Sequence, residues 1–131
     1  MSNFERVIRY VTEQPWAIKP EALGVIIDIL EFRAGGGRLS QDEIDERIGD
    51  DRKRNEVSRR DPVAVVPLQG TIMPRARVME QISGGRSVED FRDDLLRADA
   101  DPDVTAIVMD ISSPGGSVEQ VPEVAEVIRN L

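Results

Sequence analysis

A short glycine-rich turn, residues 113–117, carries the residue types in this chain that could do chemistry. Two adjacent glycines, Gly115 and Gly116, follow an apolar run and Pro114. Because glycine has no Cβ, the chain can turn steeply there and its backbone N–H groups stay unshielded. We expect the amides of Gly115, Gly116 and Ser117 at the entrance of a helix, where the dipole favours negative charge. Such amides could stabilise an oxyanion, whereas the simpler interpretation is a turn that needs glycine only for its conformation.

The serines near this turn would need an adjacent base to act as nucleophiles at neutral pH. The chain has no histidine and no cysteine, and its lysines, Lys19 and Lys53, have no spacing relation to the turn. We therefore interpret three serines as turn and capping residues: Ser112, Ser113 and Ser117. Ser117 with Gln120 matches the Ser-x-x-Gln capping box. The residues alone thus predict half of a hydrolytic site.

Two apolar runs and a helix between them are expected to position the turn. Val63 to Leu68 is rich in valine and predicts a central strand. Val104 to Ile111 lacks polar alternation, which predicts a parallel strand buried on both faces. Ser87 with Asp90 predicts a capped helix, and the residues 101–103 a turn. The order strand, helix, strand predicts a right-handed βαβ crossover.

The region after the turn, residues 118–131, predicts the next helix. Pro122 is compatible with that helix only if its first regular turn begins near Val121. Between the strand at 63–68 and the helix at Ser87, residues 73–86 show little periodicity and are expected to form a surface loop.

The amino-terminal part has helical periodicity. Apolar spacings of three and four predict an amphipathic helix over residues 4–13, and Pro20 opens a second helix that ends at the glycines 35–37. Ser40 with Glu43 predicts the capped start of a third helix, which carries Ile44 and Ile48. Trp16 is interpreted as a core or interface anchor. The charged run of residues 50–61 is interpreted as a solvated helix end and linker, or else as a partner or processing site.

Composition narrows the possible partners. Seventeen basic residues against twenty-five acidic ones give a net charge of −8, which argues against nucleic-acid binding. The longest apolar stretch, residues 22–30, contains Asp28 and is shorter than the ~20 residues needed to cross a bilayer. We expect a cytoplasmic protein with no membrane partner, no metal and no cofactor.

The order of these segments resembles a known peptidase family. The segments are Pro62-Val-Ala-Val-Val-Pro-Leu-Gln-Gly-Thr-Ile72, the helix from Ser87, and the run from Asp101 through Ser-Ser-Pro-Gly-Gly-Ser117. They resemble the signal peptide peptidase A (protease IV) family of serine peptidases, in the ClpP/crotonase superfamily. Tyr10-Val-Thr-Glu-Gln-Pro-Trp-Ala-Ile18 resembles the front end of the phage prohead proteases in that family.

The resemblance implies an α/β fold with a partial ClpP/crotonase-like core over residues 63–131, preceded by a helical module over 1–55 and a charged linker over 56–62. It implies that Gly115 and Gly116 form part of the oxyanion hole. An extended substrate would contact Gly116, Ser117 and Val118 by β-addition. The family's nucleophilic serine and its lysine base match no residue of this chain, which is expected to be inactive alone.

The same resemblance suggests partners and a location. They are a polypeptide substrate, further copies or the carboxy-terminal half of the same protein, and capsid or scaffold proteins, in the host cytoplasm or the virion. The two predicted strands leave a sheet with open edges and an under-covered apolar face, which favours association. One alternative is a non-catalytic assembly or scaffold partner with the same fold fragment. Another is a crotonase-like acyl-CoA enzyme, which would need a nucleotide pocket that the sequence does not display.

Overall fold

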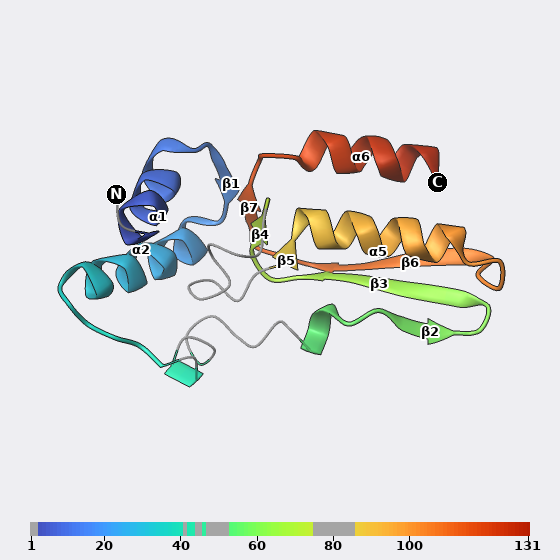
Figure 1. The fold of residues 1–131 in the computed structure, drawn as a ribbon, viewed down its shortest axis with the longest axis horizontal. Helices are drawn as coiled ribbons and strands as arrows, with labels where there is room; N and C mark the ends of the chain where they lie inside the picture. The colour runs from blue at the N-terminus through green and yellow to red at the C-terminus, as the bar shows by residue number, and fades with distance from the viewer. Residues whose placement is uncertain (1–2, 41, 44–45, 47–52, 75–85) are drawn as a thin grey trace.

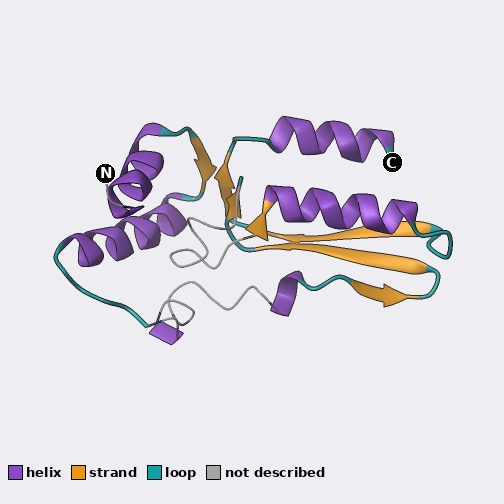
Figure 2. Ribbon diagram, in the orientation of Figure 1, coloured by secondary structure: helices purple, strands orange, loops and turns teal. Residues whose placement is uncertain are grey.

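The protein has a mixed α/β fold with two small β-sheets (Figures 1 and 2). The computed structural model describes residues 3–40, 42–43, 46, 53–74 and 86–131. The described elements are, in chain order, α1 (Asn3–Glu13), β1 (Trp16–Ile18), α2 (Pro20–Ala34), a 3₁₀ turn (Lys53–Asn55), β2 (Ser58–Arg60), β3 (Val63–Gln69), β4 (Ile72–Met73), β5 (Arg86–Ser87), α5 (Val88–Ala100), β6 (Ala106–Ser112), β7 (Gly115–Ser117) and α6 (Val121–Asn130).

The two amino-terminal helices form where the periodicity predicts them. Helix α1 buries Val7 and Val11, which lie four residues apart on one face. Pro20 occupies the first turn of α2, where its missing N–H costs no hydrogen bond. The chain leaves α2 at Gly35, whose N–H donates to the carbonyl of Glu31 at 3.0 Å. Both predicted helices are confirmed.

A first hydrophobic core joins these helices to the short strands. Its buried members are Val7, Val11, Ile26, Ile29, Leu30 and Met73. Trp16 packs against this core, and its indole N–H donates to the carbonyl of Val11 at 3.0 Å. Its ring meets that of Tyr10 edge to face, with the centroids 6.2 Å apart. The prediction that Trp16 anchors a core is confirmed.

A second core forms between α5, α6 and the strand pair β3–β6. Strands β3 and β6 are parallel, in a register from Val63 opposite Ala106 to Gln69 opposite Ser112. The hydroxyl of Ser87 accepts a hydrogen bond from the Asp90 amide at 3.3 Å and so caps α5. The buried members are Ala64, Val66, Leu68, Val88, Phe91, Leu95, Ala98 and Val124. The strand, helix, strand order is confirmed as a parallel crossover.

Strand β6 is much more exposed than its sequence predicts. Val108 is 49% exposed and Ile111 57%, so the prediction of burial on both faces is wrong for this chain. The sheet order is β2-β3-β6, which makes β6 an edge strand with one hydrogen-bonded neighbour among the described strands. Val108 and Ile111 lie three residues apart and therefore on opposite faces of the strand, so apolar residues on both faces are under-covered.

The glycine turn also differs from its prediction. Gly115 to Ser117 form strand β7, and α6 begins only at Val121, so these amides do not lie at a helix entrance. The cap position is taken by Gln120, in a left-handed conformation with φ 63°, and the predicted capping box between Ser117 and Gln120 does not form. The start at Val121 is the one that accommodates Pro122.

Several further predictions concern segments that the structure describes only in part. Ser40 and Glu43 form the predicted capping box, with the Glu43 amide 3.2 Å from the Ser40 hydroxyl oxygen. Ile44, Ile48 and most of the expected loop at 73–86 lie outside the described residues. Strand β2, within residues 56–62, pairs antiparallel with β3. Among the described residues, no helix combines the length and apolar character needed to span a membrane.

Candidate functional site

The paired glycines lie in the middle of the four-stranded sheet β1-β7-β4-β5. Strand β7 pairs antiparallel with β1, and Ala17 is opposite Gly116. On its other side it pairs parallel with β4, where Ile72 is opposite Gly116. These short strands lie between the amino-terminal helices and the layer formed by α5 and α6 (Figure 1). The candidate site thus joins segments from the two ends of the chain.

The close approach of three backbones explains why two glycines occur here. A Cβ added to Gly115 would lie 2.0 Å from the carbonyl oxygen of Ala17, and one added to Gly116 would lie 2.0 Å from that of Ile72. Gly115 also has φ of 107°, a conformation that L side chains rarely adopt. No other residue type fits at either position without displacing a neighbouring strand.

The amide of Gly115 is held within the turn. It donates to the hydroxyl oxygen of Ser113 at 3.1 Å, and that hydroxyl in turn donates to the Gly115 carbonyl at 3.2 Å. Ser117 makes a similar local contact, because its hydroxyl oxygen accepts from the Glu119 amide at 3.2 Å. These contacts confirm that Ser113 and Ser117 serve turn chemistry.

The amide of Gly116 faces β1. The Lys19 amide donates a hydrogen bond to the carbonyl oxygen of Pro114 at 2.9 Å, and the Val118 amide donates one to the carbonyl oxygen of Pro15 at 3.5 Å. Hydrogen-bonded pairs recur at every second residue of an antiparallel ladder, so the pair between these two contacts, Ala17 with Gly116, is hydrogen-bonded as well. The Gly116 amide is therefore directed at the carbonyl of Ala17.

The side chain of Tyr10 lies near those of Ser117 and Glu119. Its hydroxyl oxygen is buried and has no hydrogen-bond partner among the described residues. Burial raises the pKa of Tyr10 above its ordinary value, the Ser117 hydroxyl opposes this rise, and the Glu119 carboxylate adds to it. The phenol is therefore neutral at physiological pH.

Sequence reasoning missed the part that residues 15–19 play at this site. Lys19 has no spacing relation to the glycine turn, yet its backbone contacts Pro114 directly. The sequence signal for this short strand is the pair of strand-favouring residues Trp16 and Ile18 at alternate positions. The neighbouring sequence does not identify the strand that pairs with it, because β7 lies near the other end of the chain.

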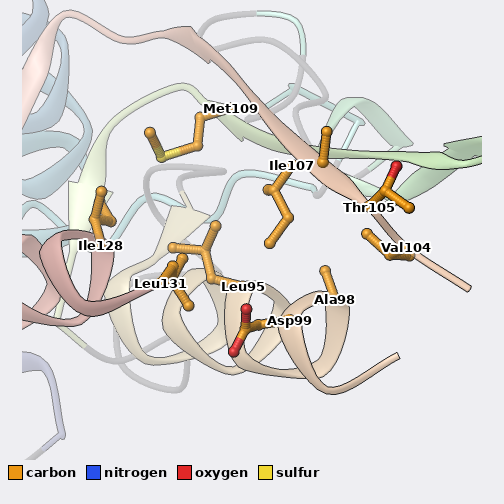
Figure 3. Close-up of a pocket in the computed structure, with 10 residues that line it drawn as sticks. Leu95, Ala98, Asp99, Val104, Thr105, Ile107, Met109, Ile128 and Leu131 are labelled. Carbon is orange, nitrogen blue, oxygen red and sulfur yellow. The ribbon is translucent and has the colours of Figure 1, made fainter. Parts of the chain in front are cut away.

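A pocket of about 280 Å³ lies between α5, β6 and the end of α6, away from the glycines (Figure 3). Most of its lining residues have apolar side chains, among them Leu95, Ile107, Met109 and Ile128. Among the lining residues that the structure describes, Asp99 is the one with an ionisable side chain, so these residues offer no acid–base pair for catalysis. Within the described parts of the chain, no group of three or more potential ligands could hold a metal ion.

Comparison with known proteins finds one phage protein with local similarity. The chain is 33% identical to Capsid assembly protease C of Escherichia phage lambda over 66 residues. The match covers 50% of this chain and 15% of the phage protein. No protein-family profile matches the chain, and no solved structure matches it. The similarity relates this chain to a phage capsid protease.

Proposed function

We propose that this chain supplies the oxyanion-hole and substrate-binding side of a serine endopeptidase of the phage prohead type, on a ClpP/crotonase-like core. In this proposal the amide of Gly116 is the oxyanion donor and Gly115 shapes the turn that presents it. Gly116, Ser117 and Val118 bind the extended substrate through their backbones. The local similarity to a phage capsid protease and the order of the motifs support this assignment.

One observation carries the proposal: the Gly116 amide is directed at a carbonyl oxygen of an extended chain, that of Ala17. An oxyanion donor has to meet a substrate carbonyl in this way and remain bound as that oxygen becomes negative. The glycine pair permits the approach, because a Cβ at either position would collide with a neighbouring backbone.

The reaction would be acyl transfer. A serine hydroxyl attacks the scissile carbonyl carbon, its proton passes to a lysine amine, and the carbonyl oxygen becomes the oxyanion that Gly116 stabilises. Collapse of this intermediate returns the proton to the leaving amine and leaves an acyl-enzyme, which water then hydrolyses. The resemblance assigns neither the serine nor the lysine to a position in this chain, and capsid or scaffold polypeptides would be the substrates.

The test is to remove the Gly116 N–H without adding a side chain. Glycolic acid in place of Gly116, introduced by chemical ligation into the complete peptidase, replaces the amide by an ester and keeps the backbone shape. We expect kcat/KM for cleavage of a capsid polypeptide to fall on the order of 10²-fold. The same exchange at Gly24 is the control, because it also removes one backbone N–H but does so in helix α2, outside the glycine turn. Equal rates for the Gly116 ester and the unmodified protein would refute the role.

The second candidate is a non-catalytic assembly partner, and the exposed apolar residues of β6 favour it. Val108, Met109 and Ile111 are all exposed on this edge strand. In that case the chain would bind copies of itself or another capsid component through β6. Sedimentation of the chain and of its Ile111→Lys variant tests this: a loss of association in the variant supports it, and a monomer in both cases contradicts it.

A further inference from the structure

We propose that the outer edge of β7 is a peptide-binding site and that residues 15–19 of this chain are its resident, displaceable ligand. This inference rests on the proposed function, which it deepens by naming the segment that fills the substrate position and the kind of peptide that replaces it.

The resident segment covers the whole edge of β7. Its pairs run from Trp16 opposite Ser117 to Ile18 opposite Gly115, and the flanking contacts extend this to Pro15 and Lys19. Because the Gly116 amide faces Ala17, the segment takes the hydrogen bond that a substrate carbonyl would need. The opposite edge of β7 is paired with β4. An incoming strand can therefore bind only where β1 now lies.

The ladder between β1 and β7 is weak at both of its ends, because each end pair contains a proline. Lys19 donates to Pro114, but Pro114 has no N–H to return the bond. Val118 donates to Pro15 at 3.5 Å, and Pro15 likewise has no N–H. Only the pair of Ala17 and Gly116 can exchange two hydrogen bonds. Such a short, proline-limited strand is suited to exchange with a competitor.

The side chains of β1 indicate which peptides the edge prefers. Trp16 and Ile18 pack against the first core, and Trp16 also bonds the Val11 carbonyl. Ala17, between them, is exposed. The matching ligand is an extended peptide that runs antiparallel to β7, with an aromatic residue, any residue and then an aliphatic one. Its middle residue must keep its N–H, so that position excludes proline.

Lys19 allows the resident strand to be weakened without changing its side chains in the core. Its backbone, at φ −60° and ψ 133°, already has the φ that proline requires. Lys19→Pro therefore removes the donor to Pro114 with little conformational conflict. Lys19→Ala keeps that donor and is the matched control. Both changes remove the same exposed ammonium group. Proline also stiffens the segment in the conformation that it already has, which opposes displacement, so tighter peptide binding by Lys19→Pro than by Lys19→Ala reports the lost hydrogen bond.

The experiment is fluorescence anisotropy with a labelled peptide that has the sequence of residues 14–19, Gln-Pro-Trp-Ala-Ile-Lys. In the unchanged chain, the tethered segment competes at an effective concentration on the order of millimolar, so the peptide binds weakly. We expect Lys19→Pro to bind it about fivefold more tightly than the unchanged chain and Lys19→Ala, the ratio that corresponds to one hydrogen bond of about 1 kcal/mol. A peptide with proline at the alanine position should not bind.

Equal affinities of the folded Lys19→Pro and Lys19→Ala variants would overturn the proposal, as would binding of the proline-containing peptide. A second measurement needs no variant: saturating peptide should abolish hydrogen-exchange protection of the Lys19 amide in the unchanged chain, and retained protection would refute displacement. Neither readout requires catalysis. Peptide binding with normal cleavage by the Gly116 ester would reject the oxyanion role alone.

Discussion

Replacing Gly115 with alanine should detach β1 from β7 while the two cores remain folded. The added methyl group would lie 2.0 Å from the Ala17 carbonyl oxygen and 2.8 Å from the Cα of Ile18. Both contacts are with backbone, so no side-chain rotation can relieve them. The neighbouring strand must move, and β1 is held by few hydrogen bonds.

Three terms determine the change in the free energy of unfolding. An L residue at φ of 107° is strained by about 1–3 kcal/mol. Detachment of β1 removes the two flanking hydrogen bonds and those of the Ala17–Gly116 pair, each worth about 1 kcal/mol. Alanine also stiffens the unfolded chain, which returns about 0.4–1 kcal/mol. Because detachment itself relieves the strain, we expect a loss of about 2–4 kcal/mol in the free energy of unfolding.

Urea unfolding followed by fluorescence measures this change, because Trp16 in β1 is the only tryptophan of the chain. The folded variant should show altered emission because the backbone that carries Trp16 shifts relative to Tyr10 and Val11. The control is Gly24→Ala, where an added Cβ meets no atom within 4 Å and helix propensity predicts a gain of up to about 1 kcal/mol. An unchanged midpoint and emission in Gly115→Ala would refute the register of β1 against β7.

Three further predictions concern catalysis, the buried ion pair and alkaline stability. The isolated chain should not cleave peptide substrates. This prediction would be contradicted by peptide cleavage that persists after repurification and disappears when a serine near the turn is mutated. Asp94→Ala should lower the free energy of unfolding in urea by about 3–5 kcal/mol, because it removes the carboxylate that pairs with the buried Arg86 guanidinium. Arg97 is an exposed partner of Asp94, so the control Arg97→Ala should cost at most about 1 kcal/mol. A small effect of Asp94→Ala would show that Arg86 is solvated. Folding raises the pKa of Tyr10, so the contribution of this phenol to the free energy of unfolding is fully present below the unfolded pKa and is lost as pH rises through the folded pKa. Above about pH 10, Tyr10→Phe should therefore lose less stability than the unchanged chain. Equal alkaline unfolding curves would contradict that assignment.

Several elements of this chain could be predicted from local sequence because their signals act over a few residues. The apolar spacing in α1, the proline that opens α2 and the serine that caps α5 all stabilise a helix through neighbours within about one turn. The valine-rich run of β3 and its parallel crossover to β6 were likewise predictable. The glycine pair could be identified as a place where backbone must be approached closely.

The tertiary structure determines which segments lie against the backbone of the glycine pair. A glycine-rich segment before a helix is compatible with a helix entrance or with a strand, and the choice at Gly115 and Gly116 depends on β1 and β4, which come from distant parts of the sequence. Strand pairing draws its stability from hydrogen bonds to a partner that local sequence does not name. The same reason explains the exposure of β6: its apolar residues predict a need for burial, but only the arrangement of neighbouring elements determines whether that need is met.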